Sequence, residues 1–138
     1  MNDLDEPPPL RAAIKESKKS KNRFKVGASI ARGKKVLSKA CNTRKTHPKY
    51  GSGNYQTLHA ESHAIYKAVR MGIDIAGATI YVFRENYNLA KPCSCCMNLI
   101  YEHGLKEVVY SDNQKVKSSI IVHGLRCIKT IKECWPAL

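Results

Sequence analysis

Apolar and polar residues recur in the first third of the chain with the spacing of a helix followed by a β-hairpin. In the segment 10–22, apolar residues lie at helical spacing among lysines, and a proline precedes them, which predicts an amphipathic helix. The segments 25–31 and 34–40 contain short apolar runs and are joined around Gly33. A glycine at that position favours a tight turn between two strands, so we expect a hairpin.

The middle of the chain predicts a helix, a strand and a second helix. Residues 58–70 are rich in helix formers and end before a glycine, which suits the C-terminus of a helix. Residues 77–83 form an apolar, β-branched run that is typical of a buried strand. Residues 93–103 follow Pro92 and end before Gly104, and these two residue types favour a helix start and a helix end.

The final segments predict a strand over 107–111, a helix over 113–124 and a strand over 126–131. A connection that holds a helix favours a right-handed crossover, so we expect the last two strands to be parallel. With the hairpin included, the pattern contains five strands separated by helices. It predicts an α/β fold of three layers, α/β/α, around a mixed five-stranded sheet.

Length and composition are those of one ordinary globular domain. The chain has 138 residues, of which 43% are hydrophobic and 25% are charged. We expect a flexible tail over 1–9 and a single domain over 10–138. No apolar run approaches the roughly 20 residues of a membrane span, and the acidic, proline-rich start differs from a signal peptide. These features predict a cytoplasmic protein with no membrane partner.

The charge is strongly positive and unevenly distributed. The formal net charge is +13, and residues 1–50 carry 14 Lys and Arg against 4 Asp and Glu. Such a field favours anionic partners, either phosphate-bearing small molecules or single-stranded nucleic acid bound through the basic N-terminal region. A well-solvated basic surface with no partner is an equally simple explanation for most of these lysines.

The cysteines are arranged for a metal rather than for disulfides. Six cysteines are present, but three of them fall within four positions and no feature indicates secretion. Cys93 and Cys96, three apart at a helix start, face the same way, and with His59 they form a donor set suited to zinc. Three protein ligands leave a fourth position for water, as in catalytic sites. A structural site would be closed by a fourth side chain, for which the candidates are Cys41, Cys95 and His63.

Helix geometry suggests roles for Glu61 and Cys95. Glu61 lies two residues after His59, where a carboxylate can take a proton from a zinc-activated water and return it to a leaving nitrogen. The alternative is an acidic residue that only stabilises the first turn of a helix. Cys95 is rotated by about 200° from Cys93, so we expect it to pack as a small apolar residue.

Two motifs connect these residues to a known family. The first is H-x-E at His59-Ala60-Glu61, and the second is P-C-x-x-C from Pro92 to Cys96, each at the start of a predicted helix. Together they are the signature of zinc deaminases that act on nucleobases. From about residue 25 to residue 131 the chain resembles the cytidine and deoxycytidylate deaminase superfamily. The segments most similar to deoxycytidylate deaminases are VGASI, GATIYVF, PCSCCMNLI and HGLKEVVYSD.

The resemblance implies a cytidine deaminase-like fold and a hydrolytic reaction. A cytosine nucleotide, dCMP above all, would be converted to its uracil form with release of ammonia. Zn²⁺ would be held by His59, Cys93 and Cys96, and Glu61 would carry the proton. The resemblance also implies that the chain assembles into a homo-oligomer.

Contacts to the substrate are implied as well. Asn42 matches an asparagine that hydrogen-bonds the sugar, and Ala60 matches a residue whose backbone N–H holds the base carbonyl. Arg44 and Lys45, together with Lys49 in the same loop, would bind a phosphate. The simpler alternative for Asn42 is a turn-forming residue at a strand end, and for the basic loop it is contact with solvent alone.

Two other functions are consistent with the sequence. The first is a polynucleotide deaminase acting on cytosine or adenosine in single-stranded DNA or RNA, supported by Tyr50 and Tyr55 among the basic residues of the loop 41–57. Strong salt dependence would distinguish it from a mononucleotide enzyme, because binding a polymer releases counterions. The second is a nucleic-acid-binding module whose zinc is structural and is closed by a fourth protein ligand.

Overall fold

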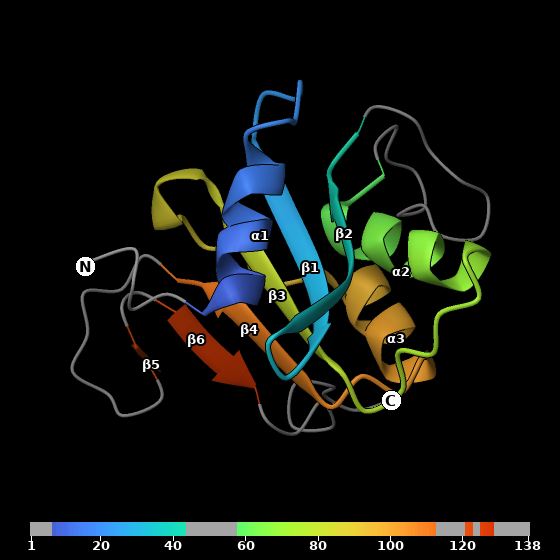
Figure 1. The fold of residues 1–138 in the computed structure, drawn as a ribbon. Helices are drawn as coiled ribbons and strands as arrows, with labels where there is room; N and C mark the ends of the chain where they lie inside the picture. Colours follow the sequence, from blue (N-terminus) through green and yellow to red (C-terminus); the bar gives the residue numbers. More distant parts are fainter. Residues whose placement is uncertain (1–6, 44–57, 113–120, 123–124, 129–138) are drawn as a thin grey trace.

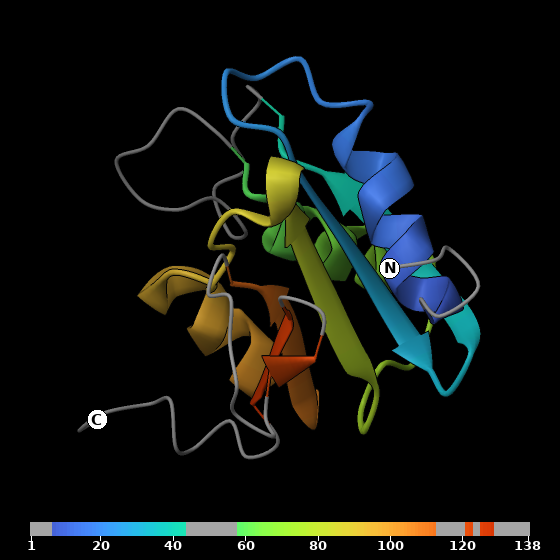
Figure 2. The same ribbon diagram turned by 90° about the vertical axis from the view of Figure 1, so that its left-hand side faces the viewer.

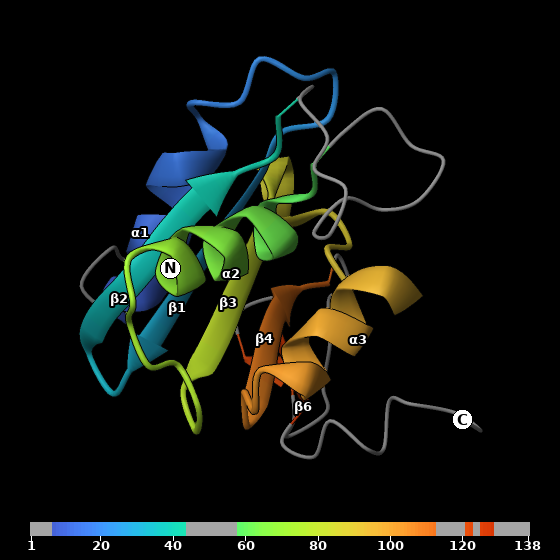
Figure 3. The same cartoon turned by 90° about the vertical axis from the view of Figure 1, so that its right-hand side faces the viewer.

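A mixed β-sheet with helices on both faces makes up the fold (Figure 1). The computed structural model describes residues 7–43, 58–112, 121–122 and 125–128. Figure 2 shows α1 (blue) and α3 (gold) on opposite sides of the sheet, and Figure 3 shows α2 and α3 together on one face. The helices are α1 (Pro8–Ser17), α2 (Ala60–Arg70), the short 3-10 helix η2 (Glu85–Tyr87) and α3 (Ser94–Glu102). The predicted α/β fold with a mixed sheet is confirmed.

Six strands form the sheet among the described residues, in the spatial order β2-β1-β3-β4-β6-β5. The first four in that order have five to seven residues each, and two shorter strands extend the sheet beyond β4. β3 and β4 are parallel, whereas every other neighbouring pair is antiparallel. The strands are β1 (Val26–Arg32), β2 (Lys35–Cys41), β3 (Thr79–Arg84), β4 (Glu107–Ser111), β5 (Ile121–Val122) and β6 (Leu125–Ile128).

The edge of the sheet beyond β4 corrects the prediction of five strands with the last two parallel. β6 is antiparallel to β4, and β5 and β6 pair with each other as antiparallel strands. The predicted helix over 113–124 is wrong at Ile121 and Val122, which form β5, and its other positions lie outside the described residues. Two adjacent β-branched residues favour a strand. Only two residues then separate β5 from β6, too few for a crossover between parallel strands.

The other elements lie close to their predicted positions. β1 and β2 form the expected antiparallel hairpin, and Gly33 in its turn has a φ of +64°, a conformation that glycine adopts at little cost. α1 begins at Pro8, two residues before the predicted start, because a proline is tolerated in the first turn of a helix. It ends at Ser17, five residues before the predicted end at residue 22, so the predicted C-terminal end of this helix is wrong. None of the described helices is long and apolar enough to cross a membrane.

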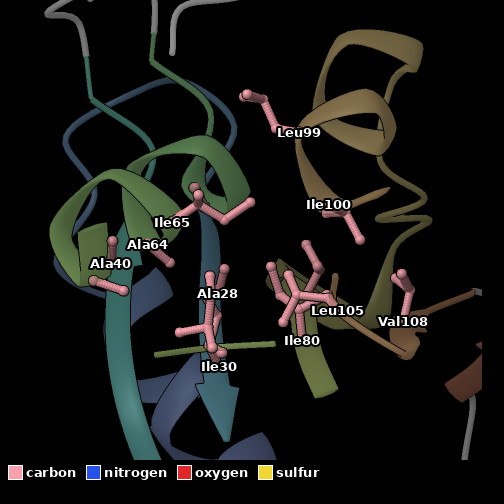
Figure 4. Close-up of a cluster of buried hydrophobic side chains, with 14 of the residues drawn as sticks. Ala28, Ile30, Ala40, Ala64, Ile65, Ile80, Leu99, Ile100, Leu105 and Val108 are labelled. Atoms are coloured by element: carbon pink, nitrogen blue, oxygen red, sulfur yellow. The ribbon is translucent and has the colours of Figure 1, made fainter. Parts of the chain in front are cut away.

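The main hydrophobic core lies between the sheet and the pair α2 and α3. Figure 4 shows Ile65 of α2 and Ile100 of α3 gathered with Ile80 of β3, and all three side chains are fully buried. Burial of a side chain of this size stabilises the fold by about 1.5–3 kcal/mol. This shared core fixes α2 and α3 relative to the sheet, and so it also fixes the positions at which the two helices begin.

A smaller cluster holds α1 against the opposite face of the sheet. Leu10 and Ala13 of α1 pack on Phe83 of β3. α1 lies very close to β1 at Gly27, where a β-carbon would overlap the backbone carbonyl of Ala13. Because only glycine lacks that atom, Gly27 allows this close approach.

Candidate active site

The candidate active site lies where α2 and α3 begin. β2 and β3 both run antiparallel to β1, so their carboxyl ends lie at the same edge of the sheet, and the chain continues from each toward one of these helices. His59 immediately precedes α2 and Cys93 immediately precedes α3, each with an extended backbone. The first N–H groups of a helix lack carbonyl partners within the helix and carry a partial positive charge. Two such helix starts favour thiolates and anionic ligands between them.

Three potential metal ligands meet at this point. The Sγ atoms of Cys93 and Cys96 lie 3.5 Å and 3.4 Å from Nδ1 of His59. The ligand atoms of all three residues lie within 4.8 Å of one another, so the group could hold a metal ion. One imidazole and two sulfur ligands are a set that zinc accepts in tetrahedral sites. The structure therefore brings together the three residues that the sequence proposed as ligands.

No fourth described side chain joins this group. Nδ1 of His63 lies 2.9 Å from the backbone carbonyl oxygen of Cys41, which occupies that ring nitrogen. Cys95 is exposed, so the expectation that it packs as an apolar residue is wrong. It projects from the first turn of α3 on the side away from the core because its neighbour Cys96 points inward. Within the described chain, the donor set is that of an open site.

The pKa values of the two thiols are shifted in opposite directions. A hydrogen bond from Cys96 lowers the pKa of Cys93 to about 4, and His59 contributes to the same shift. The hydrogen bond to Cys93, together with burial, raises the pKa of Cys96. Ser62, whose hydroxyl lies 3.2 Å from the sulfur of Cys96, supplies a further polar contact. The hydrogen bond with Cys93 also raises the pKa of His59.

Glu61 lies in the first turn of α2 and is almost completely buried, with 5% of its surface exposed. Burial raises the pKa of its carboxyl group because a charge is less stable away from water. The side chain also lines a cavity of about 570 Å³ that His59 and Cys93 border. A buried carboxyl group beside a metal-ligand set, at the wall of a cavity, is suited to accepting and donating protons.

The cavity also includes two residues that the sequence assigned to substrate binding. Ala60, the first residue of α2, lines it with a backbone N–H that has no carbonyl partner within the helix. Asn42 follows β2 and lines it too, but its side chain is already bound within the protein. Oδ1 accepts hydrogen bonds from the Ser20 hydroxyl at 2.6 Å and from the Val26 backbone N–H at 3.1 Å, and Nδ2 donates to the Phe24 carbonyl oxygen at 2.7 Å. These hydrogen bonds show that Asn42 stabilises the end of β2, which is the simpler of the two roles that the sequence suggested.

The remaining predicted contacts lie outside the described residues. These are Arg44, Lys45 and Lys49, and the same holds for Tyr50 and Tyr55 of the polynucleotide hypothesis. The cavity contains other cations that the sequence analysis missed, namely Arg23, Arg84 and Lys91. One signal pointed to Arg84, since a charged residue at the carboxyl end of a buried strand of an α/β sheet lies where ligands usually bind.

Comparison with protein families explains this combination of residues. A model of the cytidine and deoxycytidylate deaminase zinc-binding region matches residues 9–112. The chain belongs to this family of zinc-dependent deaminases. The resemblance carried by the H-x-E and P-C-x-x-C motifs is thereby confirmed. Zn²⁺ is the cofactor, because the matched region is the zinc-binding region of the deaminases and the donors of His59, Cys93 and Cys96 fit that ion.

Relatives within the deaminase family include phage enzymes and two proteins of known structure. The deoxycytidylate deaminases of Enterobacteria phages T2 and T4 are each 38% identical over 69 residues, which are 50% of this chain and 32% of theirs. The chain thus matches about a third of the length of these curated relatives. A cytidine deaminase from Burkholderia pseudomallei has the same fold, with a TM-score of 0.68 and 24% identity over 99% of this chain and 98% of that one.

The second solved structure is the dCMP deaminase of cyanophage S-TIM5. In its apo form it aligns with a TM-score of 0.59 and 25% identity, covering 78% of this chain and 82% of that one. A further structure of the same enzyme, in complex with dCMP and dUMP, aligns with a TM-score of 0.58 and 24% identity over 78% and 81% of the two chains. The fold is therefore shared with a protein named cytidine deaminase and with one named dCMP deaminase.

Proposed function

We propose that this protein is a zinc-dependent deaminase that hydrolyses the exocyclic C–N bond of a cytosine mononucleotide, converting dCMP to dUMP and ammonia. The observation that carries the proposal is that the buried carboxyl group of Glu61 lines one cavity together with His59 and Cys93, which form a potential metal site with Cys96. A binding module needs no buried carboxyl group there, whereas a hydrolytic reaction needs a proton carrier.

In this proposal the three ligands and Glu61 have separate roles. His59, Cys93 and Cys96 hold Zn²⁺, which when bound lowers the pKa of a coordinated water toward 7. Glu61 takes a proton from the attacking water and delivers it to the leaving nitrogen. The oxygen of water becomes bonded to C4 of the base as the C4–N bond breaks, and the amine leaves as ammonia. Ser62 orients Cys96 through the contact between its hydroxyl and the sulfur.

The remaining groups would orient the substrate. The backbone N–H of Ala60, at the start of α2, would donate to the carbonyl of the base, and Asn42 would contact the sugar. Arg44 and Lys45 remain predicted phosphate contacts. A cavity of about 570 Å³ lies within the range that small-molecule sites usually have, roughly 300–1,000 Å³.

The choice of dCMP rests on the relatives. The phage sequences that align with half of this chain are deoxycytidylate deaminases, and one aligned structure holds dCMP and dUMP. The sequence segments around β1, β3 and α3 are similar to the same branch. The expectations of a cytoplasmic location and a homo-oligomer belong to this proposal, and analytical ultracentrifugation measures the oligomeric state.

Substitution of Glu61 by glutamine tests the reaction directly. We expect the Glu61→Gln variant to bind one zinc ion per chain as the unmodified protein does, because Glu61 is not a ligand, and to lose roughly 10²–10⁴-fold in turnover of dCMP. Metal analysis and an ammonia-release assay measure the two quantities. Glu102→Gln, which changes an exposed carboxylate on α3, is the matched control and should leave both unchanged. Full activity of Glu61→Gln would refute the role assigned to Glu61.

A substrate panel tests the base and the polymer state. We would compare dCMP, cytidine and a cytosine-bearing oligonucleotide at two salt concentrations, with identification of each product. Turnover of dCMP with little salt dependence supports the proposal. Preferred turnover of the oligonucleotide, falling steeply with salt, supports a polynucleotide deaminase instead. Absence of ammonia release from every cytosine compound by the zinc-loaded protein would refute the proposed function.

A further inference from the structure

The cavity beside Glu61 carries an excess of positive charge. Arg23, Arg84 and Lys91 line it, and Glu61 is the single carboxylate among the described lining residues. Cationic side chains in a partly enclosed cavity concentrate anions, because the surrounding protein screens charge less than water does. A ligand that fills this cavity is therefore expected to carry negative charge.

Arg84 differs from the other two cations because one of its donors is buried and unpaired. It is the last residue of β3, and its Nε–H has no hydrogen-bond partner among the described residues. A buried N–H without an acceptor is costly, so such groups are usually paired with protein, water or ligand. The guanidinium group presents its N–H donors as a planar fork that matches the oxygens of a phosphate.

Neighbouring segments hold the guanidinium group of Arg84 in place. Its central carbon lies 4.6 Å from the centroid of the Phe24 ring, and Arg23 lies over the same ring at 5.5 Å. The backbone N–H of Glu85 donates to the Lys25 carbonyl oxygen at 3.1 Å, and the Lys25 N–H donates to Oε1 of Glu85 at 3.3 Å. These hydrogen bonds hold Glu85 against Lys25, and so they fix the backbone beside Arg84 to the backbone beside Phe24. A side chain ordered in advance loses little freedom when a ligand binds.

We propose that Arg84 binds the phosphate of the nucleotide whose base is presented to Glu61. The inference rests on the proposed function, since it assigns the two ends of one substrate to one cavity. Lys91, an exposed residue that lines the same cavity, adds a second positive charge to it. The ligand class is a phosphate ester, which either a 5′-monophosphate or the backbone of a single strand can supply. Arg84 thus makes the site selective for nucleotides over nucleosides.

The test compares phosphorylated with unphosphorylated ligands in matched variants. Calorimetry with the zinc-loaded 138-residue chain measures binding of three kinds of ligand. These are dUMP and deoxyuridine, dAMP and deoxyadenosine, and a cytosine oligonucleotide without a terminal phosphate. In Arg84→Gln we expect at least a tenfold loss of affinity for the monophosphates relative to the nucleosides. Arg84→Lys, which keeps the charge but not the fork, should lose less. Arg70→Gln, an exposed arginine at the end of α2 that does not line the cavity, should lose nothing.

Each outcome decides the proposal. A preference for monophosphates that disappears in Arg84→Gln supports a terminal phosphate at Arg84, and a loss confined to the oligonucleotide supports a phosphodiester there. If Arg84→Gln binds every phosphorylated ligand as the unmodified protein does, or if nucleosides lose equally, the proposal is overturned. Circular dichroism and zinc content show whether the variant is folded. Because product binding requires no turnover, this result is independent of whether any cytosine compound is deaminated.

Discussion

Cys93 and Cys96 have different environments although they lie within one helical turn. Cys93 precedes α3 and is exposed, whereas Cys96 lies in the first turn and is buried. Their hydrogen bond favours a thiolate at Cys93 and a thiol at Cys96 when no metal is bound. Zinc binding then requires the release of one proton from the buried sulfur, so the site becomes weaker as the pH falls.

This asymmetry predicts an unusual pH profile for alkylation of the zinc-free protein. Because the pKa of Cys93 is about 4, its thiolate is already formed at pH 6. We expect the rate at which Cys93 reacts with iodoacetamide to change less than about twofold between pH 6 and pH 8. The rate of an ordinary thiol rises almost a hundredfold, which is about the ratio of its thiolate fractions at the two pH values. Mass spectrometry measures the rate. In Cys96→Ala the donor is lost and the pH dependence should return. A steep rise in the unmodified protein would contradict the prediction.

At the scale of elements, β1 is the strand that both helical layers share. α1 packs over it on one face, and α2 packs over it on the other (Figure 3). The close approach of α1 depends on Gly27, since a β-carbon there would overlap backbone atoms of Ala13 and approach the backbone nitrogen of Ser17. Backbone cannot turn aside as a flexible side chain can, so any larger residue must displace the helix.

We therefore expect Gly27→Ala to reduce the free energy of unfolding by about 2 kcal/mol or more, as overpacking in a core does. Urea unfolding followed by circular dichroism measures the change. Gly33→Asn is the matched control, because Gly33 has a φ of +64° with open space around it and asparagine tolerates that conformation. The control should lose less than about 1 kcal/mol. Equal losses in the two variants would show that α1 can move without cost.

Local patterns were sufficient for most elements and for bringing together the three candidate metal ligands. The helices that begin at Ala60 and Ser94 follow from helix formers, caps and the spacing of the motifs. The antiparallel pairing of β6 with β4 did not follow, because β5, the strand of two residues just before β6, is too short to show a periodicity of its own and lies in the segment predicted as a crossover helix. Arg84 and Phe24 were missed for a similar reason. They are 60 positions apart and meet only through the pairing of β1 with β3.

At the scale of the whole molecule, the candidate metal site joins the starts of two helices that also pack in one core. His59 belongs to the start of α2, and Cys93 and Cys96 belong to the start of α3. A bound ion held by all three would link segments that are more than thirty residues apart in the sequence. These segments are the starts of α2 and α3 (Figure 1). Binding of an ion to the folded chain alone stabilises it through mass action.

Removal of zinc should accordingly lower the thermal stability of the whole domain. With free zinc at a thousand times its dissociation constant the stabilisation is about 4 kcal/mol, which corresponds to a fall of roughly 10 °C in Tm when a chelator is added. Differential scanning calorimetry with and without the chelator measures it. Cys96→Ala should melt at one temperature under both conditions, because it lacks a ligand. A chelator-independent Tm in the unmodified zinc-loaded protein would contradict the proposed ligand set.

The hydrogen bonds of Asn42 limit what any sugar can do beside it. Both lone pairs of its carbonyl oxygen are taken, by the Ser20 hydroxyl and the Val26 N–H, and one amide hydrogen is given to Phe24. Among the described residues a single amide N–H of Asn42 is left, so a ribose or deoxyribose hydroxyl that reaches this residue can only be an acceptor toward it. That hydroxyl must send its own hydrogen elsewhere, and a fluorine in its place, which accepts weakly and donates nothing, would keep the same orientation.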